Sequence, residues 1–446
     1  MTARPPDGHL SKETLEGLAL GRRVGEQVLP SVLDHLARRC PTCRRVLEAY
    51  PRELVAARAG GDYEAARQRA SRRLLDLAGE REAAPFRMAE LLEGRMVAEA
   101  LAWVSASPRF HTWGLASVLT ERSEEALEEL PREARVWAQL AVAVAARLDP
   151  AVYGERVVAE ARALAGVRLA LAMLETGDDP AVAEHELALA AARGLGASDA
   201  AAIEAEIDLA RARLDLAAGR FEEARARAEG VAELSSGGRF AQLRLEALLL
   251  LGRALRGAGE ASLALSAFQV LRAIVDRYGE LPWMERRVSL EIGETLSRLG
   301  EHAAGLRVLH ALEIAEADEP GRTAPRRAYW AGVSLRGLGR IEEAEEALEA
   351  AWRGFAAEDA AVEALRALLD LAALYLEAKR PRSVAKLMEE GIELFRIDRL
   401  PRGLALVLFR IRVQAARGKL DSAAVAAARV SLEPAAKPSA IRPLVH

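Results

Sequence analysis

The chain of 446 residues is 51% hydrophobic but only 4% aromatic, and its 29% of charged residues leave a net charge of −4. Alanine and leucine supply much of the apolar content, which favours closely packed helices over β-sheet. The mixed charge excludes a chain that binds nucleic acid over its whole surface. No stretch reaches the ~20 apolar residues of a membrane span, and the N-terminus lacks the apolar core of a signal peptide. We therefore expect a cytoplasmic protein without membrane contact.

Residues 1–60 are predicted to form a small helical domain with a metal site. One helix begins near Ser11, which can cap it, and a second covers about residues 26–38. Two thiolates and two imidazoles near these helices can form a closed tetrahedral zinc site; they belong to His9, His35, Cys40 and Cys43. A Cys-x2-Cys pair can also be a redox dithiol, but such dithiols usually lie in a βαβ unit, which is not predicted here.

These residues resemble the zinc-binding anti-sigma factor family, whose pattern is an early His or Cys followed by His-x3-Cys-x2-Cys. The separation of His9 from His35 fits this pattern, whereas His35-x4-Cys40 is one position longer than the family spacing. The resemblance covers about residues 9–50. It implies a structural zinc ion held by His9, His35, Cys40 and Cys43, and a protein partner that is an alternative sigma factor of RNA polymerase.

Residues 61–130 are predicted to be a helical connector. A long helical stretch over residues 80–104 is followed by a break at Ser105–Pro108. An apolar cluster comes next, and we interpret it as a docking core rather than a ligand pocket; it contains Phe110, Trp113, Leu115 and Val118.

Residues 131–430 repeat a helical hairpin. The pattern is clearest in residues 325–355, where Gly337-Leu338-Gly339 separates two stretches with apolar residues at helical spacing. Matching anchor positions recur at a nearly constant step, at Gly219, Gly259, Gly300, Gly339, Lys379 and Gly418. Gly177 lies roughly one further step before the first anchor. One such hairpin cannot bury its own apolar face, so it needs neighbours.

Small residues mark the expected contact between the two helices of each hairpin. Seven positions before the anchors lie Ala212, Gly252, Gly293, Gly332, Ala372 and Ile411. Five positions after them lie Ala224, Ala264, Gly305, Ala344, Val384 and Ala423. We expect Gly332 to pack near Ala344. Replacement of Gly332 by leucine should then destabilise the array, whereas alanine should be neutral or stabilising.

This pattern resembles the tetratricopeptide repeat (TPR) family, which consists of helix-turn-helix units of about 34 residues. The resemblance covers about residues 200–430 and is best at Gly339. It implies an all-α fold in which the small N-terminal domain is followed by a right-handed α-solenoid of TPR-like hairpins over residues 131–430. The anchors here are more widely spaced than in the family, which predicts longer helices or links. Residues 431–446 contain three prolines and no periodicity, so we expect a mobile tail.

The sequence contains no recognisable catalytic constellation, so we do not expect an enzyme. His185-Glu186 begins like a metalloprotease motif, but Leu189 stands where the second histidine is required. The two resemblances together predict a non-enzymatic regulator. Its zinc domain would bind a sigma factor, and its solenoid groove would bind a second protein or peptide, without direct contact to nucleic acid. The alternative is a general TPR interaction scaffold in which the zinc knuckle is only structural.

Overall fold

The computed structural model describes residues 61–197, 200–234, 241–278, 281–313, 321–395, 402–417, 419–430 and 432. Within these ranges the chain is helical and contains no β-strand, which confirms the all-α prediction. No helix in this part of the chain is long and apolar enough to span a membrane. The expected zinc domain and the tail after Leu432 lie outside the described residues.

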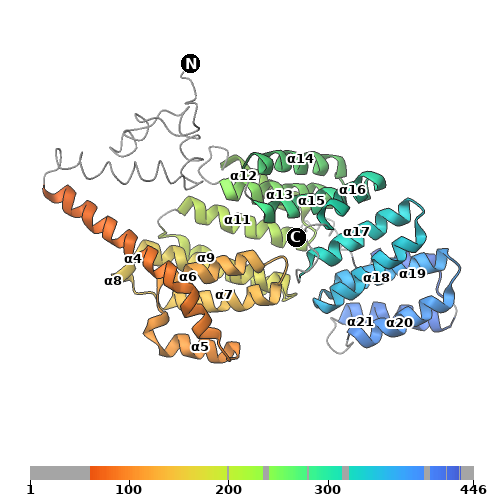
Figure 1. Ribbon diagram of the computed structural model, residues 1–446, viewed down its shortest axis with the longest axis horizontal. Helices are drawn as coiled ribbons and strands as arrows, with labels where there is room; N and C mark the ends of the chain where they lie inside the picture. Colours follow the sequence, from red (N-terminus) through yellow and green to blue (C-terminus); the bar gives the residue numbers. More distant parts are fainter. Residues whose placement is uncertain are drawn as a thin grey trace, which may run out of the picture.

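The helices follow one another as antiparallel neighbours along a curved path (Figure 1). The first part consists of α4 (Gly61–Leu92), α5 (Val97–Ala106), the short η1 (Pro108–Phe110), α6 (Trp113–Ala126), α7 (Pro131–Ala146) and α8 (Pro150–Tyr153). Seven helix pairs follow: α9 (Glu155–Glu175) and α10 (Pro180–Gly194); α11 (Ala200–Ala217) and α12 (Phe221–Leu234); α13 (Ala241–Gly257) and α14 (Ala261–Tyr278); α15 (Pro282–Arg298) and α16 (His302–Glu313); α17 (Thr323–Gly337) and α18 (Ile341–Ala357); α19 (Ala361–Glu377) and α20 (Pro381–Phe395); α21 (Arg402–Ala416) and α22 (Ser422–Val430).

In the six pairs from α9–α10 to α19–α20, an anchor residue follows the first helix in the left-handed conformation. Their φ angles are +82° at Gly177, +72° at Gly219, +88° at Gly259, +80° at Gly300 and +75° at Gly339. Glycine adopts this conformation without steric cost, which is why it recurs there. Lys379 occupies the same place with φ +56° despite its side chain. The repeat spacing therefore located these six hairpin turns correctly, including the loosely spaced turn at Gly177. The predicted anchor Gly418 lies outside the described residues.

The small residues before the anchors are buried where two helices cross. A Cβ atom on Gly252 would lie 2.4 Å from Phe268 Cε1, and one on Gly293 would lie 2.6 Å from Leu309 Cδ2. Each glycine thus faces a large side chain of the second helix, which fills the space the glycine leaves.

Gly332 follows the same rule, and its surroundings differ from the sequence prediction. The atoms nearest to a Cβ atom there belong to Leu348, one helical turn beyond Ala344, and Leu348 Cγ would lie 2.8 Å away. A methyl group is therefore not accommodated without a shift, so alanine at this position should be neutral at best and not stabilising. The last repeat also departs from the pattern, because Ala423 is exposed and Val425 is buried in its place.

The predicted docking core of the connector is present. Phe110 and Leu115 are fully buried in a cluster with residues of α7, and Trp113 packs against it, whereas Val118 is only partly buried. Helix α6 packs against α7 and α9. The buried Ser123 Oγ donates a hydrogen bond to the carbonyl of Ala134, at 2.8 Å. The connector is thus continuous with the helices that follow it.

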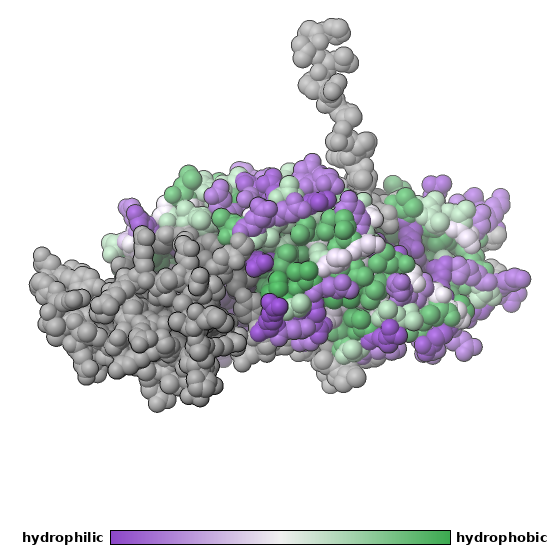
Figure 2. Space-filling view, turned by 90° about the horizontal axis from the view of Figure 1, so that it is seen from above, coloured by the Kyte–Doolittle hydropathy of each residue, from purple (hydrophilic) through white to green (hydrophobic). Residues whose placement is uncertain are grey.

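The outer helices differ in polarity. Figure 2 shows the face along α14, with hydrophobic residues gathered near its middle. Leu263 and Val270 of α14 are 54% and 53% exposed. By contrast, α18 begins with charged residues such as Glu342 and Glu343 on its solvent side.

Candidate functional site

The first helices of successive pairs line one large cavity on the inner side of the curved array. Its volume is about 1540 Å³. The wall comes from the end of α9 and from α11, α13, α15, α17 and α19, and the start of α7 and the end of α22 complete it. We call this cavity the groove. Apart from α22, the second helices contribute only residues at their ends, so groove chemistry is set by one face of each first helix.

A single glutamate binds three of these helices together. Glu128, in the link between α6 and α7, forms ion pairs with Arg287 Nη2 at 2.6 Å, Arg253 Nη1 at 3.0 Å and Arg213 Nη1 at 3.3 Å. These partners belong to α15, α13 and α11 and lie up to 159 residues away in sequence. Burial alone would raise the pKa of Glu128, but Arg253, Arg287 and Arg213 outweigh it and hold the pKa well below the ordinary value.

A second charged layer joins α13, α15 and α17. The fully buried Glu291 of α15 pairs with Arg253 at 2.7 Å, Arg256 at 2.6 Å and Arg326 at 2.9 Å. Burial acts to raise the pKa of Glu291, and the three guanidinium groups reverse this and lower the pKa strongly. Glu294 shares Arg256 and Arg326. Most arginines of the groove wall are therefore already neutralised by the chain itself.

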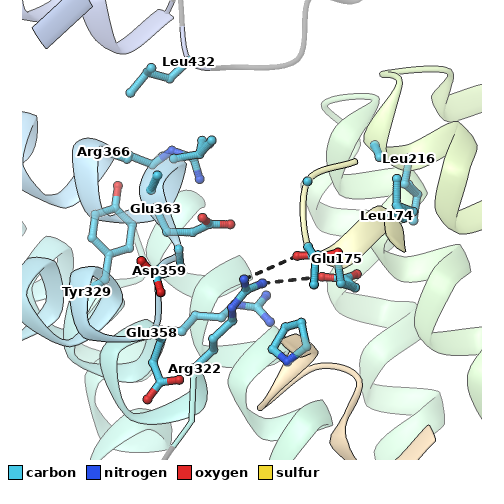
Figure 3. A pocket seen from close by; sticks show the side chains of 18 of the residues that line it. Leu174, Glu175, Leu216, Arg322, Tyr329, Glu358, Asp359, Glu363, Arg366 and Leu432 are labelled. Atoms are coloured by element: carbon cyan, nitrogen blue, oxygen red, sulfur yellow. Dashed lines mark hydrogen bonds and ion pairs between the residues drawn. The ribbon is translucent and has the colours of Figure 1, made fainter. Parts of the chain in front are cut away.

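Contacts between distant helices close the array into a ring, and we call them the clasp. The backbone N–H of Thr323 donates to Glu129 Oε2 at 2.9 Å, and the Thr323 hydroxyl donates to the other carboxylate oxygen. Arg132 pairs with Asp359. Arg322 and Glu175 face each other across the groove in Figure 3, with 3.6 Å between Nη1 and Oε2. The clasp joins the start of α7 and the end of α9 to α17 and α18.

The part of the groove near α19 has a different character. Glu358, Glu363 and Arg366 line it and form no ion pair among the described residues. Tyr329 and Trp330 of α17 lie beside them but are only 3% and 5% exposed, with their rings 4.9 Å apart in an edge-on arrangement. The partly exposed Val362 of α19 supplies apolar surface here. Figure 3 shows the side chains of Glu363, Arg366 and Tyr329 near one another on this side. This region offers both charges and apolar surface to a ligand.

A buried carboxylate lies behind this surface. Asp370 of α19 has only 4% of its side chain exposed. It accepts a hydrogen bond from the Tyr329 hydroxyl at 2.6 Å and pairs with Arg429 of α22 at 2.9 Å. Burial raises the pKa of Asp370, and Arg429 opposes that shift. Burial and the neighbouring Asp370 also raise the pKa of Tyr329.

The residues singled out as metal ligands, His9, His35, Cys40 and Cys43, lie outside the described residues. Within the part of the chain that the structure describes, no three His, Cys, Asp or Glu side chains are arranged to hold a metal ion. The zinc set therefore stays a prediction.

Comparison with known proteins identifies the fold. No protein-family model and no curated protein matches the sequence. Among solved structures, the chain is similar to a signal transduction ATPase with numerous domains (STAND) that has a tetratricopeptide repeat sensor, from Pyrococcus horikoshii. The TM-score is 0.50 at 15% identity, over 80% of this chain and 53% of that chain. The fold is TPR-like. A Rap protein complexed with competence and sporulation factor gives a TM-score of 0.49 at 14% identity, over 70% of this chain and 85% of that chain.

Sequence reasoning missed the charged wall of this TPR-like groove, although a signal was present. Thirteen positions before five successive anchors the chain always carries a charged residue, at Glu206, Glu246, Arg287, Arg326 and Arg366. The first four form ion pairs with neighbouring first helices. A charge that recurs at one fixed repeat position is therefore a sequence signal for the inner face of the array.

Proposed function

We propose that this protein is a non-enzymatic interaction regulator whose groove binds a segment of a partner protein. The size of the groove carries the proposal. At about 1540 Å³ it exceeds the roughly 300–1,000 Å³ of small-molecule sites, and it runs along several first helices. Repeat arrays use such extended inner surfaces to bind proteins.

The lining supports a peptide rather than a purely apolar ligand. Ala361 and Val362 are partly exposed and offer surface for apolar side chains, while Glu358, Glu363 and Arg366 offer charges that no described side chain neutralises in an ion pair. All five stand on helices or at helix ends that are held by buried neighbours. Rigid placement lowers the entropic cost of binding, so such a wall suits recognition of an ordered segment.

A second partner is proposed for the N-terminal domain. The spacing of His9, His35, Cys40 and Cys43 supports a structural zinc site of the anti-sigma type, and with it an alternative sigma factor as partner. In the alternative, the chain is a general TPR scaffold and the zinc knuckle only stabilises the fold. Metal analysis separates a zinc site from inert cysteines: the wild type should contain one zinc ion per chain, and a Cys40→Ser, Cys43→Ser double variant should contain almost none.

Site-specific photo-cross-linking tests the groove. A photoreactive amino acid replaces Val362, which lines the groove, or Val270, which is exposed on α14 at the outer face. In cells that produce the protein, the Val362 variant should form adducts with a discrete partner, and the Val270 control should not give the same adduct. Adducts from position 270 alone, with none from 362, would overturn the proposal. Mass spectrometry of the adduct shows whether the partner is a sigma factor.

A further inference from the structure

The last helix leaves the path of the repeats. In a regular hairpin α22 would pack against α21, but it packs mainly against α19, the first helix of the preceding pair. Val425 and Leu432 are 2% and 7% exposed and belong to the core cluster around α17–α20. Arg429, Val430 and Leu432 also line the groove. The C-terminal helix therefore covers part of the surface proposed for a partner.

Arg429 makes the most specific contact of this helix. Its Nη1 lies 2.9 Å from Asp370 Oδ1, and its Nη2 lies 3.5 Å from the Tyr329 hydroxyl. Asp370 lies on α19 with Tyr329 of α17 as its other hydrogen-bond partner. A carboxylate with 4% exposure is costly when its charge is uncompensated. This site therefore favours a cation, and α22 supplies one.

Helix α22 is short and buries little apolar surface. It has nine residues, and helices this short have little stability of their own in water. Alanine and valine make up most of it, and Val425 is its only buried residue. Arg417, Lys419 and Asp421 in the preceding link are exposed. Little apolar area would be lost if α22 moved away from α19, so exchange for another ligand is feasible.

We propose that α22 is an internal ligand that competes with the partner for the groove. This proposal rests on the proposed groove function and specifies the ligand. The ligand is a short helix of small residues that places an arginine or lysine against Asp370. With α22 in place this end of the groove is partly covered, and a partner segment with a matching cation displaces α22. Binding of the partner would thus release the C-terminal segment.

A peptide with the sequence of residues 419–432 tests the competition, since it is the internal ligand itself. Its fluorescein-labelled form is titrated with the full-length protein, and binding is followed by fluorescence anisotropy. Tethering gives α22 an effective concentration on the order of mM, so wild type should bind the peptide weakly. Arg429→Glu, which repels Asp370, should bind the added peptide about tenfold or more tightly. Arg429→Lys keeps the charge and should behave like wild type.

A second set of variants tests Asp370, the residue that pairs with Arg429. Asp370→Asn in the Arg429→Glu protein should abolish the gain, and a peptide with glutamate in place of Arg429 should bind none of the proteins. Equal binding by wild type and Arg429→Glu, or a gain that persists with Asp370→Asn, would overturn the proposal. Circular dichroism verifies that each variant is folded.

Hydrogen exchange of the wild type gives an answer that needs no variant. Amides of α22 should exchange faster than those of α19, and the added peptide should not change those of α10. Equal protection of α22 and α19 would also contradict the proposal. Because this measurement concerns only the C-terminal helix, its failure would leave the cross-linking test at Val362 unaffected, and the two ideas can be judged separately.

Discussion

The packing at Gly332 yields a measurable contrast between two glycine-to-alanine substitutions. Gly332 of α17 is buried, and a Cβ atom there would lie 2.8 Å from Leu348 Cγ and 3.2 Å from the Leu348 backbone nitrogen. Gly230 of α12 is exposed, and a Cβ atom there would meet nothing within 4 Å. Both are inside helices, where alanine is favoured over glycine by about 1 kcal/mol.

The two effects oppose each other only at Gly332. Overpacking costs about 1–3 kcal/mol, because the leucine side chain can rotate but the backbone nitrogen moves only if α18 moves. Gly332→Ala should therefore change the free energy of unfolding by between zero and about −2 kcal/mol, after the helical gain of about 1 kcal/mol. Gly230→Ala should raise it by up to about 1 kcal/mol. Gly332→Leu should lower it by about 3 kcal/mol or more.

Urea unfolding followed by far-UV circular dichroism measures all three variants against wild type. The expected order of stability is Gly230→Ala, wild type, Gly332→Ala and Gly332→Leu. If Gly332→Ala were stabilised as much as Gly230→Ala, the close approach of α17 and α18 at Leu348 would be wrong. A Gly332→Leu variant as stable as wild type would refute the register of the hairpin itself.

Three further predictions concern charge and backbone conformation. Glu128→Gln leaves three arginines without their shared carboxylate and should cost about 3 kcal/mol of stability in thermal melts, whereas Glu349→Gln in the exposed pair with Arg353 should cost under about 0.5 kcal/mol. Folding lowers the pKa values of Glu128 and Glu291 below the ordinary glutamate value of 4.5, so both carboxylates stabilise the fold at a pH above 4.5. This stabilisation is lost as the pH falls through the pKa values of the folded state. The melting temperature should thus drop steeply below about pH 4.5, and less steeply for Glu128→Gln; a flat profile would contradict the buried pairs. Lys379→Gly relieves a left-handed residue and should raise stability by roughly 1 kcal/mol; an unchanged or lower melting temperature would mean that Lys379 is not strained.

The repeat spacing predicted the hairpins because local rules fix them. Glycine at a left-handed turn and a small residue seven positions earlier depend only on the two helices they join, so their pattern recurs at every repeat. The spacing locates the contact between two helices but not the side chain that fills it. The sequence pairs Gly332 with Ala344 because both are small, whereas the space beside Gly332 is filled by a large residue one helical turn further on, Leu348.

The groove was harder to predict because its contacts join distant residues. Glu128 meets Arg287 only because the array curves back on itself, and nothing in the link between α6 and α7 indicates this. The position of α22 was hard to predict for the same reason. Its sequence fits a second helix of a hairpin, and the decisive contact, Arg429 with Asp370, joins two helices whose positions in the chain no periodicity connects.

The clasp has a consequence for how this chain can vary. Open solenoids tolerate gain or loss of a repeat, since each unit touches only its neighbours. Here Glu129 must reach Thr323, and Arg132 must reach Asp359, after a fixed number of hairpins. A duplicated or deleted hairpin between them would rotate one side of the ring away from the other and break both contacts at once. The closed ring therefore fixes the number of hairpins between α7 and α18. We expect insertions to be accommodated in the links on its outer side rather than as whole repeats.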